Sequence, residues 1–125
     1  MTNLPLKIAL IGCGRIAGHH CQSIGQVDGV ELAAVCDLDV AKAKAYGDQF
    51  SVPHFTDYHD MFQAVPEIDI AAVITPSGMH FEHGADVIER YKKHLIMEKP
   101  TFMRPEQLHT AYGAADNHGL HIFPV

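Results

Sequence analysis

Cysteine and positive charge are both scarce in this sequence. The 125 residues contain only three cysteines, Cys13, Cys21 and Cys36, and no Cys-x-x-Cys pair. This arrangement indicates neither a disulfide framework nor a zinc knuckle, so reduced and mostly buried thiols are expected. Lysine and arginine together number 9 against 15 aspartates and glutamates, without a basic tract. That balance argues against a protein that binds nucleic acid or anionic membranes.

Long hydrophobic runs are missing as well. The apolar run at residues 8–11 stops at a glycine, and the residues before it lack a cationic start. It is therefore too short for a signal-peptide core or a membrane span. Repeats, low-complexity segments and linkers are also absent. With 125 residues, 47% of them hydrophobic, residues 1–125 are expected to form one compact domain of a cytoplasmic protein.

Sequence patterns typical of strands and of helices alternate along the chain. Apolar runs predict six strands, at residues 6–11, 30–36, 54–55, 68–74, 94–97 and 120–125. Helical stripes separate them, among them Ile16, His20, Ile24 and Val27 in the first helix and Leu108, Ala111, Tyr112 and Ala115 in the last. This alternation predicts an α/β fold with a doubly wound parallel sheet of the Rossmann type, in the strand order 3-2-1-4-5-6.

A glycine motif follows the first predicted strand. Gly12-Cys13-Gly14-Arg15-Ile16-Ala17 matches G-x-G-x-x-G/A and opens a helix, the context that a dinucleotide fingerprint requires. Gly12 would permit the tight turn, Gly14 would let a pyrophosphate approach the backbone, and Ala17 must allow close packing of helix on strand. Amides near Arg15 and Ile16, with the helix dipole, would bind the phosphates. The segment therefore predicts a dinucleotide site rather than a mere glycine turn.

A carboxylate ends the second predicted strand. Asp37 lies 37 − 12 = 25 positions after the first glycine, near the ~20 typical of the acid that binds the adenosine ribose. Because it would repel a 2′-phosphate and neither Leu38 nor Asp39 supplies a guanidinium, NAD is preferred over NADP. The alternative is that Asp37 only caps the next helix, a place for which Asp39 is better suited.

Two further segments lie at strand ends. Thr75-Pro76, with His80 a few residues on, follows the fourth strand, and Glu98-Lys99-Pro100 follows the fifth. Ligands of such sheets bind at the carboxyl ends of the strands, which makes both segments site candidates. Lys99 offers a cation or a proton donor that Glu98 can orient. The alternative for Lys99 is an ordinary solvated loop lysine.

In that order and spacing, these motifs resemble the nucleotide-binding domain of the Gfo/Idh/MocA oxidoreductases, the glucose-fructose oxidoreductase and inositol dehydrogenase relatives. The likeness spans essentially the whole chain, and Glu98-Lys99-Pro100 is its most specific part. The resemblance implies NAD(P)-dependent hydride transfer at a carbinol carbon of a sugar, polyol or nucleotide sugar. It also implies a catalytic Lys99 near the nicotinamide, Pro76 lining the cofactor cleft, and His80 opening the next helix.

The sequence departs from the family pattern in two ways. Ser77-Gly78 stand where the family often has Asn, which leaves a side-chain contact to the cofactor there unsupported. Family members also continue into a second α/β domain with most substrate contacts, a catalytic histidine and the oligomer-forming sheet. The chain is therefore expected to be the cofactor-binding part of a longer, homo-oligomeric enzyme and to be inactive alone.

Other functions fit the same residues less well. A non-catalytic dinucleotide-binding or sensing module is the main alternative, since a fold alone does not establish turnover. A methyltransferase or a flavin protein is less favoured, because Leu10-Ile11 stand before the first glycine and Asp rather than Glu stands at position 37. Ten histidines invite a metal site, but only His80 and His83 share a helix face, so none is predicted.

Overall fold

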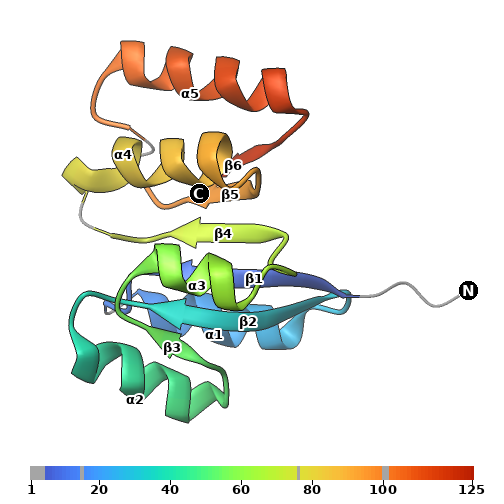
Figure 1. The fold of residues 1–125 in the computed structure, drawn as a ribbon, viewed down its shortest axis with the longest axis vertical. Helices are drawn as coiled ribbons and strands as arrows, with labels where there is room; N and C mark the ends of the chain where they lie inside the picture. Colours follow the sequence, from blue (N-terminus) through green and yellow to red (C-terminus); the bar gives the residue numbers. More distant parts are fainter. Residues whose placement is uncertain (1–4, 15, 76, 100–101) are drawn as a thin grey trace, which may run out of the picture.

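The structure is a computed structural model that describes residues 5–14, 16–75, 77–99 and 102–125. It contains one six-stranded sheet in the order β3-β2-β1-β4-β5-β6, and every pair of neighbouring strands is parallel (Figure 1). The strands are β1 (Leu6–Ile11), β2 (Val30–Cys36), β3 (His54–Phe55), β4 (Ile70–Val73), β5 (His94–Met97) and β6 (Ile122–Pro124). The predicted fold class and strand order are confirmed.

Helices follow the strands and cover both faces of the sheet (Figure 1). They are α1 (Ala17–Gln26), α2 (Val40–Phe50), α3 (Tyr58–Ala64), α4 (His80–Ala85) and α5 (Pro105–His118), with a 3-10 turn η1 (Ser77–Met79) before α4 and a π-helical segment η2 (Asp86–Arg90) after it. Within the described part of the chain, no helix has the length and hydrophobicity to cross a membrane.

Two hydrophobic clusters lie on opposite faces of the sheet because successive strand residues point in opposite directions. Ile8 and Leu10 of β1 pack with α1 and α2 on one face. Ala9 and Ile11 pack with α3, η2 and α5 on the other. Burial on both faces explains why residues 8–11 of β1 are an unbroken apolar run rather than an alternating one.

Side-chain caps fix where the helices begin. The Asp39 carboxylate accepts hydrogen bonds from the backbone amides of Ala41 and Lys42, which confirms it as the cap of α2. At α5, Gln107 Oε1 accepts from the Arg104 amide. That helix ends at Gly119, whose φ of 66° is in the left-handed region that favours glycine.

The predicted faces of two helices are partly wrong. The buried residues of α1 are Ala17, Cys21 and Ile24. Ile24 is thus buried as predicted, but Ile16 and Val27 are exposed. In α5, Ala111 and Ala115 are buried as predicted, but Leu108 is exposed. Small residues face the sheet because they let each helix approach it closely.

Candidate cofactor site

A cleft of about 830 Å³ opens at the carboxyl ends of β1, β2 and β4. Connections leave β1 and β4 in opposite directions at this point, to β2 and to β5, as in other open α/β sheets where ligands bind. The cleft has the size of a small-molecule site. Its lining includes Gly12, Gly14, Asp37, Leu38, Lys42 and Thr75.

The two glycines of the fingerprint have different surroundings. Gly12 has a φ of +108°, and a Cβ there would lie 2.9 Å from the backbone carbon and oxygen of Ile74. Its amide donates to the Cys36 carbonyl at 2.7 Å. A Cβ on Gly14 would meet no heavy atom within 4 Å. Gly12 is therefore required by the fold, whereas Gly14 leaves open space beside the start of α1.

Asp37 joins the end of β2 to the glycine loop. Its Oδ2 accepts a hydrogen bond from the Cys13 amide at 2.7 Å, and its Oδ1 accepts from the Asp39 amide at 2.8 Å. A carboxylate offers about four lone-pair sites, so both oxygens keep capacity for ligand hydroxyls. The Asp37 carboxylate is thus fixed in place before any ligand binds.

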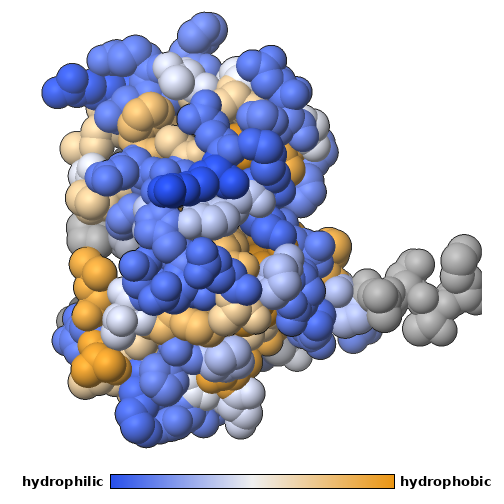
Figure 2. Space-filling view, in the orientation of Figure 1, coloured by the Kyte–Doolittle hydropathy of each residue, from blue (hydrophilic) through white to orange (hydrophobic). Residues whose placement is uncertain are grey.

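Three residues at this end of the cleft carried no signal in the sequence. Leu38, beside Asp37, is 90% exposed, and Figure 2 shows apolar side chains over the start of α2. Lys42 of α2 lines the cleft. Tyr46, one turn further, donates its hydroxyl proton to the Gly14 carbonyl at 3.1 Å. Helix α2 therefore supplies a cation, Lys42, to the cleft, and a hydrogen bond from Tyr46 that holds the glycine loop in place.

Thr75 and His80 lie together after β4. The His80 side chain is 1% exposed, and its Nε2 donates to the Thr75 carbonyl at 2.8 Å. His80 is the first residue of α4, as the resemblance implied. The hydrogen bond holds the loop that forms one wall of the cleft. A direct contact between His80 and the cofactor stays a prediction.

His83 lines the same wall one turn later. Its Nδ1 lies 2.8 Å from the Thr75 hydroxyl. Burial lowers the pKa of His83, which favours the neutral ring that can accept the hydroxyl proton. The Tyr58 ring packs edge-on against His83, and the Tyr58 hydroxyl donates to the Asp86 carboxylate. Residues of α3, α4 and η2 are therefore linked along this wall.

Glu98 and Lys99 follow β5, next to β4. Glu98 accepts at Oε1 from His20 Nε2 of α1, at 2.9 Å, and at Oε2 from the backbone amide of Lys99, also at 2.9 Å. The hydrogen bond from His20 and, to a smaller extent, the charge of Lys99 lower the pKa of Glu98, but no hydrogen bond or ion pair between the Glu98 and Lys99 side chains is found within the described ranges. An orienting role of Glu98 toward Lys99 stays a prediction. Lys99 itself is exposed.

The other predicted cofactor residues fall into two groups. Ala17 is fully buried in the core beneath the glycine loop, while Ile16 is exposed as the N-cap residue of α1. Arg15 and Pro76 lie outside the described residues, so the structure does not place them. The contacts of all these residues with a cofactor stay predictions.

The three thiols are free and buried, as predicted. Burial raises the pKa of Cys13 to about 12, even though the residue lies close to the start of α1. Its Sγ donates to the Cys36 carbonyl at 3.5 Å. Cys13 therefore fills the loop as a small protonated side chain. No group of three or more His, Cys, Asp or Glu residues arranged for a metal ion occurs in the part of the chain that the structure describes.

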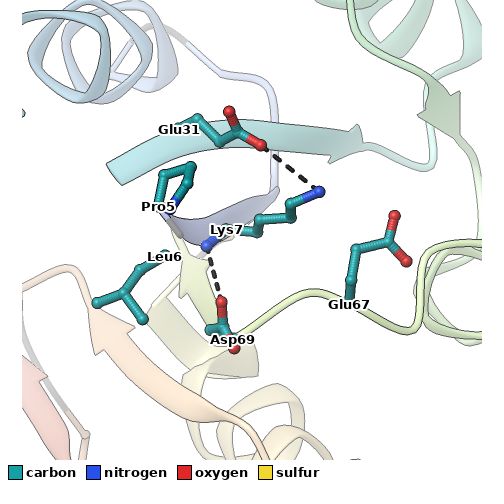
Figure 3. A pocket seen from close by; sticks show the side chains of 6 residues that line it. All are labelled: Pro5, Leu6, Lys7, Glu31, Glu67 and Asp69. Carbon is teal, nitrogen blue, oxygen red and sulfur yellow. Dashed lines mark hydrogen bonds and ion pairs between the residues drawn. The ribbon is translucent and has the colours of Figure 1, made fainter. Parts of the chain in front are cut away.

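A second groove, of about 780 Å³, lies at the amino ends of the strands. Figure 3 shows Lys7 between the acidic side chains of this groove. Lys7 Nζ lies 3.5 Å from Glu31 Oε1, and the Lys7 amide donates to Asp69 Oδ2 at 2.9 Å. With Glu67 also in its lining, this groove holds one lysine among three carboxylates and is acidic.

Taken together, the residues of the first cleft fit a dinucleotide. The open space at Gly14 lies at the start of α1, where backbone amides and the helix dipole favour phosphate. The Asp37 carboxylate, on the β2 side, suits ribose hydroxyls. The cleft continues past the end of β4 to Ile74, Thr75 and Met79, which leaves room for the second half of the ligand on that side of the loop.

Comparison with known proteins agrees with this geometry. The profile of the Gfo/Idh/MocA family, described as an oxidoreductase family with an NAD-binding Rossmann fold, matches residues 6–124. D-glucoside 3-dehydrogenase of Escherichia coli is 32% identical over 86% of this chain and 30% of its own length. Inositol 2-dehydrogenase of Salmonella typhimurium is 26% identical over 78% of this chain and 29% of its own length.

A solved structure shows the same relation. The WlbA dehydrogenase from Chromobacterium violaceum, in complex with NADH and UDP-GlcNAcA, is 33% identical over 100% of this chain and 36% of its own, with a TM-score of 0.91. The chain thus spans about a third of the length of the relatives it matches. A profile match across nearly all of its residues shows that the chain belongs to the Gfo/Idh/MocA oxidoreductase family, in the part that forms the NAD-binding Rossmann fold.

Proposed function

We propose that residues 1–125 are the NAD-binding domain of an oxidoreductase that transfers hydride to or from a carbinol carbon of a sugar, polyol or nucleotide sugar. The observation that carries the proposal is the Asp37 carboxylate, held in the cleft by the Cys13 amide at 2.7 Å. This bond supports the proposal because it holds the carboxylate that would bind the ribose at a fixed position relative to the glycine loop. The dehydrogenases named above support the substrate class.

Asp37 also sets the expected cofactor preference. A carboxylate that accepts the two ribose hydroxyls of NAD would lie against the 2′-phosphate of NADP and repel it. Lys42, which lines the same end of the cleft, weakens that repulsion but is a single flexible cation. We therefore expect NAD to bind more tightly than NADP, with a measurable residual affinity for NADP.

At the other end of the cleft, Lys99 is the proposed catalytic residue. When bound, the nicotinamide ring accepts or donates the hydride. Lys99 would hold the substrate hydroxyl and share in moving its proton, a role suited to an ammonium on a flexible stem. Its exposure leaves it accessible to a substrate brought by another part of the protein.

Titration calorimetry with NAD and NADP tests the proposal. We expect tighter binding of NAD, and Asp37→Ala should narrow the gap between the two cofactors by roughly 1–3 kcal/mol, the scale for a lost buried polar partner. The variant also frees the Cys13 amide, but damage to the loop weakens both cofactors alike and leaves their ratio unchanged. Glu31→Gln removes the same charge at the opposite edge of the sheet and serves as the matched control.

Equal or tighter binding of NADP by the wild-type protein would overturn the preference. Absence of binding by either cofactor would overturn the proposed function itself. We also propose that most substrate contacts lie outside these 125 residues, so the chain alone should bind NAD without turnover of sugars, polyols or nucleotide sugars. An absorbance assay for reduced nicotinamide checks this. The cytoplasmic location, the homo-oligomer and the lack of nucleic-acid binding stay predictions.

A further inference from the structure

A histidine of the first helix is joined to the segment after the fifth strand. His20 Nε2 and Glu98 Oε1 are 2.9 Å apart across a separation of 78 residues. The two side chains are only 19% and 16% exposed. A hydrogen bond to a carboxylate in a largely buried setting is stronger than a surface ion pair, because water screens it less. The contact is therefore a firm link between α1 and the end of β5.

Both carboxylate oxygens of Glu98 are held by hydrogen bonds. Its second oxygen accepts from the Lys99 amide at 2.9 Å, and its own amide donates to the Val73 carbonyl of β4 at 3.2 Å. The hydrogen bond from His20 is the main reason that the pKa of Glu98 is lowered. The charged carboxylate, which can accept both hydrogen bonds at once, is thus the stable form. The backbone that carries Lys99 is fixed through Glu98.

The position of this link along the cleft follows from the topology. The start of α1 is the site for the pyrophosphate, and Asp37 lies on the β2 side of it for the adenosine. The nicotinamide half must then extend to the other side, toward β4 and β5. Glu98 and Lys99 stand at the carboxyl end of β5, so His20 reaches from the phosphate-binding helix to the nicotinamide end.

We propose that His20 is a positioning residue, which acts through Glu98 to hold Lys99 at the nicotinamide end of the cleft. The inference rests on the proposed function, because it assumes that NAD lies along the cleft in this direction. It assigns to His20 a role distinct from that of its neighbour His19, which is exposed on the same helix.

The experiment compares two ligands on four proteins. NAD fills the whole cleft, whereas ADP carries the adenosine and pyrophosphate but neither the nicotinamide nor its ribose. Both are titrated into the wild type, His20→Ala, His20→Gln and His19→Ala. Glutamine at position 20 can place an amide donor where His20 Nε2 now lies, so it tests rescue. His19→Ala is the matched control for loss of an imidazole from α1.

We expect His20→Ala to weaken NAD binding about tenfold, the scale for a lost charge-assisted hydrogen bond, and to leave ADP binding unchanged. His20→Gln should restore most of the NAD affinity, and His19→Ala should behave as wild type. In amide NMR spectra without ligand, the Lys99 signal should shift in His20→Ala but not in His19→Ala.

Other outcomes would overturn the inference. Equal weakening of NAD and ADP would show that His20 only stabilises α1, and unchanged NAD affinity would show that the link has no part in binding. If His20→Ala does not fold, Glu98→Gln replaces it, since a neutral amide cannot accept both hydrogen bonds at full strength. A wild-type protein that does not bind NAD would refute the proposed function itself, whether or not it binds ADP.

Discussion

The two edges of the sheet carry grooves of similar size but opposite character. At the amino edge, acidic side chains surround Lys7, whose ammonium pairs with Glu31 and whose amide donates to Asp69 (Figure 3). At the carboxyl edge, Asp37 is held by backbone amides and keeps lone pairs for a ligand. The helices begin at the carboxyl edge and end at the amino edge, so their dipoles favour anions at the first and disfavour them at the second.

The difference shows that volume alone does not identify a binding site in this fold. The acidic groove would repel a pyrophosphate both through its carboxylates and through the helix ends that surround it. Only the carboxyl edge combines open backbone, a helix start and a fixed hydrogen-bond acceptor. Substitutions at one edge should therefore alter ligand binding, and substitutions at the other should alter stability alone.

The largest effect is expected at the carboxyl edge, from the pair Gly12→Ala and Gly14→Val. Alanine at position 12 combines a positive φ with a 2.9 Å approach to the Ile74 backbone, and should destabilise the protein by at least about 2 kcal/mol. Valine at position 14 enters open space, so it should abolish NAD binding without loss of stability. Thermal melting and calorimetry separate the two. A stable Gly12→Ala protein, or NAD binding by Gly14→Val, would contradict the distinction.

At the amino edge, Asp69→Ala should lower the stability of the protein without changing its affinity for NAD. The carboxylate accepts from the Lys7 amide at the start of β1, so its removal should cost roughly 1–3 kcal/mol of unfolding free energy. Affinity for NAD should not change, because the opposite edge of the sheet is untouched. Denaturant unfolding and calorimetry check both halves. A large loss of NAD affinity at full stability would mean that the two edges are coupled.

The wall of the cleft should show a dependence on pH. Burial lowers the native pKa of His83, so below about pH 6.5 the unfolded chain binds a proton that the native protein does not. The free energy of unfolding should therefore fall as the pH drops from about 6.5 to the native pKa of His83, and should reach its full value above about pH 6.5. Denaturant unfolding at several pH values should show that the free energy of unfolding changes less with pH in His83→Gln than in the wild type. Glutamine does not titrate but can still form a hydrogen bond with Thr75. An unchanged pH dependence would exclude His83 as its source.

The smallest effect is expected from Glu31→Gln. Glu31 pairs with Lys7 at 3.5 Å, with half of its side chain exposed, and exposed pairs contribute less than about 1 kcal/mol. Both the melting temperature and the NAD affinity should stay close to wild type. A clear gain in NAD affinity would mean that charge at the amino edge reaches the cleft, and would weaken the contrast between the two edges.

Most of the fold could be predicted because each strand is a local apolar run. Strands β1, β2, β3 and β5 have the predicted bounds. β4 is shorter than predicted: Ile68 is buried, but its amide donates to Val65 rather than to a neighbouring strand. Hydrophobicity reports burial and cannot by itself report sheet pairing. Hydrophobicity also failed to predict that Ile16 and Leu108 are exposed, although both are apolar.

The site was predictable where a motif determines local backbone shape. Gly12 and Asp37 belong to a fingerprint whose spacing follows from the geometry of a strand, a turn and a helix. The hydrogen bond from Tyr46 to Gly14 and the link between His20 and Glu98 could not be predicted. Each joins residues from different elements, and no local pattern records a contact made only when the sheet is assembled.

The π-helical segment η2 has a consequence for how the chain could tolerate insertion or deletion. The Tyr91 amide donates to the Asp86 carbonyl five residues back, so this segment holds one residue more than an α-helical turn would. Removing one residue there would restore α-helical winding and leave the residues on either side facing as before, so His83 would keep its place beside Thr75. A residue added to the segment would instead rotate everything before it by about 100° relative to β5. His83 would then turn away from Thr75, and the cleft would lose a wall through an insertion that lies outside it.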